Sequence, residues 1–117
     1  MEIIELVKLI TEAAEQEKAA DITELRVHEI TVLADYFIVS SGRSTQHVKS
    51  IADAVVQAVE AVGIPLLRQD GYGEGKWIVL DFGMVIFHAF RITEREFYKL
   101  EDLWSDVPRQ AEEPGDA

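Results

Sequence analysis

A glycine-rich loop followed by a lysine is the first feature of this sequence that could do chemistry. Gly71 to Gly75 and then Lys76 resemble a phosphate-binding loop. A Walker A loop needs a glycine five residues before the glycine that precedes the lysine, a Ser or Thr after the lysine, and then a helix. Asp70 and Trp77 occupy those two positions here, and a strand is predicted to follow. The pattern favours a flexible hairpin loop over a nucleotide site.

Three histidines could bind a metal or move a proton. His28, His47 and His88 fall on three different predicted elements, and no HExxH motif or i, i+4 pair brings two imidazoles together. His88 has apolar neighbours in a predicted strand, which favours a buried structural histidine over a catalytic one. His47 lies in the first turn of a predicted helix, where a positive charge is unfavourable, and we assign it no role. The histidines therefore predict no metal site.

Carboxylates at strand ends are the third possibility. Asp35, Asp70 and Asp81 are placed there, but metal-dependent phosphoryl or nucleotidyl transfer generally uses two carboxylates two residues apart on one strand. No predicted strand carries Asp-x-Asp or Asp-x-Glu. Ser40-Ser41-Gly42 lacks the Gly-x-Ser-x-Gly elbow of hydrolases, and the absence of cysteine excludes a thiolate nucleophile. We expect a protein that is not an enzyme and that has no metal or cofactor.

The spacing of apolar residues predicts the elements that position these side chains. Helices are expected at about 3–15, 44–62 and 93–107, and strands at 22–29, 35–42, 66–69, 77–82 and 85–90. Ser44 or Thr45 is a suitable N-cap for the second helix. Thr93 and Glu96 predict a capping box for the third, which is expected to end near Pro108.

The order of these elements, α-β-β-α-β-β-β-α, predicts an α/β fold. We expect a single domain over residues 1–108, in which helices pack on a mixed five-stranded sheet. Residues 109–117 are rich in Ala, Glu, Pro, Gly and Asp and predict a disordered acidic tail.

The last two strands form a predicted hairpin with two apolar faces. If Phe82-Gly83 is the turn, Asp81 pairs with Met84, Val79 with Ile86 and Trp77 with His88. One face then carries the core, and the other carries the candidate partner-binding side chains Trp77, Val79, Asp81, Met84 and Ile86. Either helices cover both faces or one face meets a partner, and the pattern leaves both alternatives open. Trp is a frequent anchor of protein interfaces.

The charge of the chain indicates what kind of partner fits it. With 22 acidic and 11 basic residues the net charge is −11, which disfavours direct nucleic-acid binding and suits a basic protein partner. No apolar stretch approaches the roughly 20 residues that span a membrane. Residues 1–5 lack the features of a signal peptide, and we expect a cytoplasmic protein.

Five segments of the sequence resemble one known family. They are 34–42, 48–54, 77–83, 85–90 and 95–104, and they include the pattern Trp…Leu-Asp-x-Gly…His…Phe-Tyr-x-Leu-Glu-x-Leu-Trp. In order and spacing they are similar to the ribosomal silencing factor (RsfS, Iojap-like) family over about residues 3–107.

The resemblance implies a fold like that of nucleotidyltransferases and a repressor of translation. Such a protein binds the large ribosomal subunit through its ribosomal protein fourteen, blocks subunit joining and lowers translation when nutrients are limiting. The resemblance also implies contact residues at Trp77, Asp81 and Tyr98, and possible homodimers. A nucleotidyltransferase-like enzyme with an unrecognised active site is the alternative.

One position departs from the family pattern. After the hairpin glycine the family usually has an aspartate, whereas this chain has Met84. If that aspartate pairs with a basic residue of the partner, this chain has exchanged a charge pair for apolar contact. If it only shapes the turn, little changes.

Overall fold

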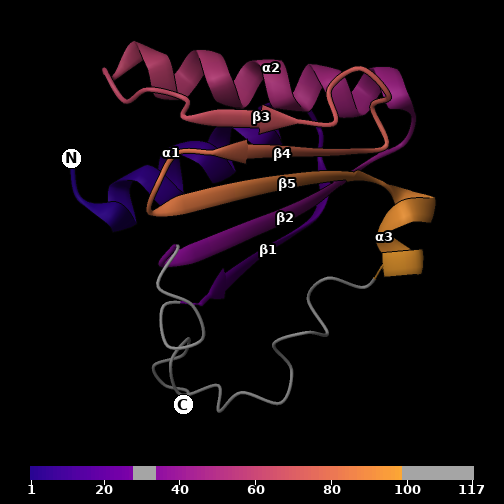
Figure 1. Cartoon of the computed structure of the whole chain (residues 1–117), viewed down its shortest axis with the longest axis horizontal. Helices are drawn as coiled ribbons and strands as arrows, with labels where there is room; N and C mark the ends of the chain where they lie inside the picture. Colours follow the sequence, from indigo (N-terminus) through magenta and orange to yellow (C-terminus); the bar gives the residue numbers. More distant parts are fainter. Residues whose placement is uncertain (28–33, 99–117) are drawn as a thin grey trace.

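Five strands form one mixed sheet, as predicted (Figure 1). The structure is a computed structural model that describes residues 1–27 and 34–98, with only the backbone of 97 and 98. Its elements are α1 (Ile3–Gln16), β1 (Ala20–Arg26), β2 (Tyr36–Gly42), α2 (Thr45–Ala61), β3 (Arg68–Asp70), β4 (Trp77–Asp81), β5 (Val85–Arg91) and α3 (Ile92–Tyr98). The predicted order is confirmed. His28, the predicted part of the third helix beyond residue 98 and the predicted acidic tail lie outside the described residues.

The sheet is mixed because its two halves are joined by a crossover. The strand order is β1-β2-β5-β4-β3. The central pair, β2 and β5, is parallel, and every other neighbouring pair is antiparallel. Parallel neighbours need a long connection, and the chain between β2 and β5 includes α2, β3 and β4.

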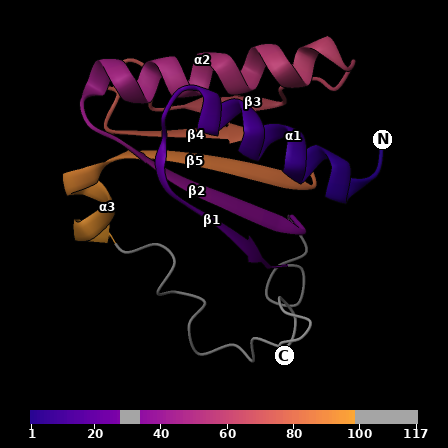
Figure 2. The same ribbon diagram turned by 180° about the vertical axis from the view of Figure 1, so that it is seen from behind.

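Helices α1 and α2 both pack on the same face of the sheet (Figures 1 and 2). Each helix has an apolar stripe, and the two stripes meet one row of alternating strand residues. We call this the helix face. The fully buried side chains at this face come from the sheet and from both helices, and they include Ile10, Ile38, Ile51, Val55, Ile78, Leu80 and Phe87.

The start of α2 is fixed by local hydrogen bonds. The Ser44 hydroxyl accepts from the backbone N–H of His47 at 3.1 Å, which confirms Ser44 as the N-cap. The His47 ring also has a structural role that the sequence did not indicate. Its Nδ1 accepts from the backbone N–H of Arg43 at 2.9 Å, and its Nε2 lies 2.7 Å from the carbonyl oxygen of Glu17. His47 thereby joins the end of α1 to the start of α2.

The predicted register of the β4–β5 hairpin was wrong by two residues. Asp81 pairs with Ile86, Val79 with His88 and Trp77 with Phe90. The turn residues are Gly83 and Met84, because the backbone N–H of Phe82 bonds to the carbonyl of Val85. Gly83 has φ +94°, which suits the first central position of a type II′ turn. Since the shift is even, the side chains of the paired strand residues keep the faces that were predicted, whereas Met84 lies in the turn and not in a strand.

The capping box predicted for the third helix was also wrong. Helix α3 begins at Ile92, so Thr93 lies inside it, and the Thr93 hydroxyl donates to the Glu94 carboxylate at 2.8 Å. Arg95 holds α3 against the sheet, where its guanidinium donates to Ser41 Oγ at 2.9 Å and to Thr23 Oγ1 at 3.1 Å. This helix therefore lies at one end of the strands.

The two outer strands are irregular or short. In β1 the register shifts between Ala20 and Thr23, and Asp21 between them has φ +52°. Strand β3 has only three residues, all exposed, and starts two residues later than predicted. A salt bridge of 3.0 Å joins Arg68 to Asp70 along this strand.

Candidate functional site

The face of the sheet opposite α1 and α2 carries the candidate site. Its side chains follow from the strand register, which places residues of β1, β2, β5 and β4 in shared rows. We call it the aromatic face, and it consists of Leu25, Phe37, Val39, Trp77, Val79, Asp81, Ile86, His88 and Phe90. A second apolar cluster, separate from the one under the helices, lies here.

Trp77 is held in place from two sides. Its indole Nε1 donates to Nδ1 of His88 at 3.1 Å. Its ring stacks on that of Phe90, with centroids 4.7 Å apart and planes 24° apart. Phe90 is the cross-strand partner of Trp77, and such pairs interact favourably in antiparallel sheets. Trp77 is half-buried, so it is a fixed side chain with part of its surface exposed.

His88 lies in the middle of the aromatic face and is 5% exposed, which confirms the prediction that it is buried. Burial lowers the pKa of His88 from 6.5 to about 4, because removal from water disfavours the charged ring. The ring is therefore neutral at pH 7. Since Nδ1 accepts from Trp77, the single ring proton is on Nε2. His88 Nε2 is buried and has no hydrogen-bond partner among the residues that the structure describes.

Four of the predicted site residues come together on this face. Trp77, Val79, Asp81 and Ile86 all lie on it and are half-buried. Asp81 also shapes the hairpin, because its Oδ1 accepts from the backbone N–H of Gly83 at 2.8 Å.

Of the other two predicted site residues, Met84 does not lie on the aromatic face and the side chain of Tyr98 is not described. Met84 occupies the turn, where it is 54% exposed. Tyr98 is the last residue of α3, and its side chain lies outside the described residues.

Sequence reasoning left five members of the aromatic face out of the candidate site: Leu25, Phe37, Val39, His88 and Phe90. Phe37 lies 4.8 Å from the His88 ring between centroids, and Phe90 supports Trp77. Phe37 reaches the site only through the parallel pairing of β2 with β5, which no local pattern encodes. His88 was read as structural, although its position opposite Trp77 in the predicted hairpin was a usable signal.

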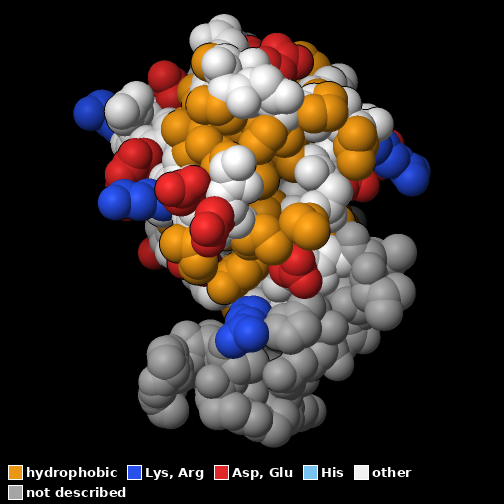
Figure 3. Space-filling view, turned by 90° about the vertical axis from the view of Figure 1, so that its left-hand side faces the viewer, with side chains coloured by type: hydrophobic (Ala, Val, Ile, Leu, Met, Phe, Trp, Pro, Cys, Tyr) orange, Lys and Arg blue, Asp and Glu red, His pale blue; other side chains and the backbone are white. Residues whose placement is uncertain are grey.

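The hairpin end of the molecule is also apolar on its surface. Figure 3 shows hydrophobic side chains gathered on the end that lies at the left of Figure 1, where β4 turns into β5. Met84 is 54% and Leu67 is 62% exposed. The Leu67 side chain lies beside Gly83, so this surface adjoins the edge of the aromatic face.

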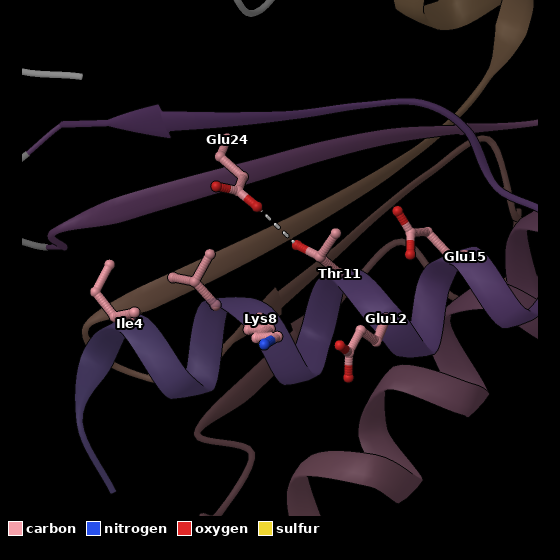
Figure 4. A pocket seen from close by; sticks show the side chains of 7 residues that line it. Ile4, Lys8, Thr11, Glu12, Glu15 and Glu24 are labelled. Carbon is pink, nitrogen blue, oxygen red and sulfur yellow. Dashed lines mark hydrogen bonds between the residues drawn. The ribbon is translucent and has the colours of Figure 1, made fainter. Parts of the chain in front are cut away.

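A groove between α1 and β1 is a separate feature. It has a volume of about 320 Å³ and is lined by Ile4, Val7, Lys8, Thr11, Glu12, Glu15 and Glu24. Thr11 donates to the Glu24 carboxylate at 3.1 Å across it (Figure 4). Within residues 1–27 and 34–98 no cluster of His, Cys, Asp or Glu could hold a metal ion. The groove is acidic, and we assign it no chemistry.

In the part of the chain that the structure describes, no helix is long and apolar enough to cross a membrane.

Comparisons with known proteins identify relatives over nearly the whole chain. A family model described as "Ribosomal silencing factor during starvation" matches residues 1–116. The ribosomal silencing factor RsfS of Halalkalibacterium halodurans is 35% identical over 104 residues, which cover 89% of each chain. That of Bacillus subtilis is 34% identical over 103 residues, 88% of this chain and 87% of the relative.

A solved structure agrees in fold as well as in sequence. A crystal structure from Chromobacterium violaceum superimposes with a TM-score of 0.88 at 35% identity, over 90% of this chain and 88% of the other. Family match, sequence identity and fold agree over nearly the same length. The chain belongs to the ribosomal silencing factor family.

Proposed function

We propose that this protein represses translation by binding the large ribosomal subunit through its aromatic face. The contact is with ribosomal protein fourteen, and the bound protein keeps the small subunit from joining when nutrients are limiting. Membership of the family supports a silencing role during starvation. The observation that carries the choice of surface is Trp77, half-exposed and fixed by His88 and Phe90.

The aromatic face has the properties of an interface centre. Trp77, Val79 and Ile86 are half-buried apolar side chains next to one another on two paired strands. Interface cores are enriched in aromatic residues, and a few of these account for most of the binding energy. Because Trp77 is already held by a hydrogen bond and a stacked ring, binding costs little additional side-chain entropy.

The net charge of −11 supports a basic protein partner. Opposite charges accelerate encounter more than they strengthen the complex. The acidity also favours a contact with a ribosomal protein rather than with the ribosomal RNA beside it. On this proposal the protein acts in the cytoplasm by occupying a surface, and no chemical step is involved.

The test is co-sedimentation with purified large subunits. We expect Trp77→Ala to weaken binding about thirtyfold, the effect of losing about 2 kcal/mol at an interface hot spot. Tyr72→Ala is the matched control, because Tyr72 is an aromatic residue that bonds to Asp53 of α2, away from the aromatic face. It should bind within about threefold of the unmodified chain.

Two results would contradict parts of this proposal. If the unmodified chain does not sediment with large subunits, the function is wrong. If Trp77→Ala and Tyr72→Ala both bind as well as the unmodified chain, binding to the large subunit is supported but the aromatic face is not the contact. Blocking itself is measured by adding the chain to separated subunits, where it should reduce the fraction that joins.

A further inference from the structure

His88 Nε2 is a buried donor for which the described part of the chain supplies no acceptor. The ring is 5% exposed, and Nε2 has no hydrogen-bond partner within residues 1–27 and 34–98. Nδ1 is already used as the acceptor for Trp77, so the proton on Nε2 cannot move to the other nitrogen without breaking that bond. Buried polar groups are almost always paired, and an exception calls for an explanation.

The position of His88 indicates where an acceptor would have to come from. On the sheet, His88 lies between Val39 of β2 and Val79 of β4. These neighbours offer only methyl groups on this face. The ring is further surrounded by the rings of Phe37, Trp77 and Phe90. Asp81 and Ser41 carry oxygens on this face two positions along the neighbouring strands, but these accept from Gly83 and Arg95. None of the described groups bonds to Nε2, and the approach that remains is from outside the sheet.

We propose that His88 is a partner-binding residue whose Nε2–H donates a hydrogen bond to an oxygen of the docked protein. This inference rests on the proposed function, and it names the polar contact at the centre of that interface. The apolar side chains around His88 would exclude water from the bond, and the bond would fix the position of the partner on the sheet.

The chemistry of the site selects a neutral oxygen. His88 is neutral at pH 7 and surrounded by aromatic and aliphatic groups. A carboxylate would lose its hydration on entry and gain only a neutral donor in return. A backbone carbonyl, or a Ser, Thr or Asn side chain, needs one good donor to be satisfied. A basic protein can present such an oxygen while its Lys and Arg side chains face the acidic surface.

Access to Nε2 requires a small movement of the side chains that cover it. Phe90 and Val39 are fully buried, whereas Phe37 and Trp77 are only half-buried. Changes of side-chain rotamer at an interface are common on binding, even where the backbone does not move. A rotation of Phe37 is the simpler route, because Trp77 is bonded to the His88 ring itself.

Two substitutions test the Nε2–H donor of His88 separately from the rest of the imidazole ring. His88→Asn keeps an amide oxygen near the place of Nδ1, so Trp77 retains an acceptor, but nothing occupies the place of Nε2. His88→Gln carries its NH₂ group near the place of Nε2. In co-sedimentation with purified large subunits we expect Asn to weaken binding about tenfold or more, and Gln to bind within about threefold of the unmodified chain. Thermal unfolding of each variant checks that it is folded.

The outcomes distinguish this inference from the proposed function. If Trp77→Ala loses binding but His88→Asn does not, or if Gln loses as much as Asn, the inference is overturned and the function stands. If the unmodified chain does not bind, both fail. Should the variants not fold, a cryo-EM map of the unmodified chain on the large subunit decides. We expect a partner oxygen within hydrogen-bond distance of Nε2; an oxygen of this chain, or carbon alone, would overturn the inference.

Discussion

Both faces of the sheet are apolar in sequence, but they differ in how their side chains are covered and hydrogen-bonded. On the helix face, Ile38, Leu80 and Phe87 are fully buried against two helices and carry no polar group. On the aromatic face, Trp77 is half-buried against the buried rings of His88 and Phe90, and the His88 ring has a donor without a partner among the described residues. The helix face contributes packing to stability, whereas the aromatic face keeps Trp77 partly exposed, and on the proposed function that exposed surface is what the partner meets.

The largest expected effect compares two phenylalanines on adjacent central strands. Phe87→Ala on the helix face removes a fully buried ring and should destabilise the protein by about 3–5 kcal/mol. Phe37→Ala removes a half-buried ring from the aromatic face and should cost less than half as much. Urea unfolding of both variants measures the difference. Equal losses would show that the two faces contribute alike to stability.

The next prediction uses the pH dependence of His88. Its pKa is about 4 in the folded protein and near 6.5 in the unfolded chain. Between those values the unfolded chain binds more protons, so stability is fully present above pH 6.5 and falls as the pH drops towards 4. The total loss is about 3 kcal/mol.

The control for this pH effect is His88→Gln, which cannot titrate. Urea unfolding near pH 7 and near pH 4 should show a larger loss for the unmodified chain than for the variant. Groups such as Glu94, whose pKa is lowered to about 2 by Arg91 and Thr93, titrate in both proteins and cancel. The same pH dependence in the two proteins would contradict the burial of a neutral His88.

A smaller effect concerns α2, one of the two helices that cover the helix face. Ser44→Ala removes the side-chain acceptor at the start of α2 and should cost about 1 kcal/mol. Large-subunit binding should stay within about threefold, because Ser44 is not on the aromatic face. Ser44→Asp restores an acceptor and should recover most of the stability, as chemical unfolding would show.

The smallest expected effect lies at the hairpin turn. The Met84 side chain is exposed, while its carbonyl accepts from the N–H groups of Asp35 and Tyr36. Met84→Asp should therefore change stability by no more than about 0.5 kcal/mol. Its binding to large subunits separates the two alternatives raised by this position. A clear gain in affinity indicates a charge pair with the partner, and no change indicates a residue that belongs only to the turn.

Local patterns predicted the elements well, and the structure shows why. The apolar residues of α1 and α2 recur with a clear helical period because each helix has one apolar stripe. Ser44 is enough to locate the start of α2. The predicted register of the hairpin was wrong by two residues because Phe82-Gly83 and Gly83-Met84 are both acceptable turns in sequence. Gly83 with positive φ at the first central position decides between them.

The candidate site was predicted only in part, because it depends on contacts between distant segments. Trp77, Val79 and Ile86 share a face by simple alternation, which the sequence reveals. Phe37 joins them through parallel pairing across a connection that includes a whole helix. That His88 Nε2 has no partner in the described part of the chain could not be predicted, since it depends on every neighbour of the ring at once.

The irregular outer strands limit how this molecule can associate. An exposed sheet edge can recruit a further strand from another chain, which leads to aggregation. Here one edge is three residues long with a salt bridge along it, and the other is interrupted where Asp21 has positive φ. Within the described residues, neither edge offers a long flat row of hydrogen-bonding groups. A chain that displays an apolar face in a crowded cell is thereby guarded against polymerising strand by strand.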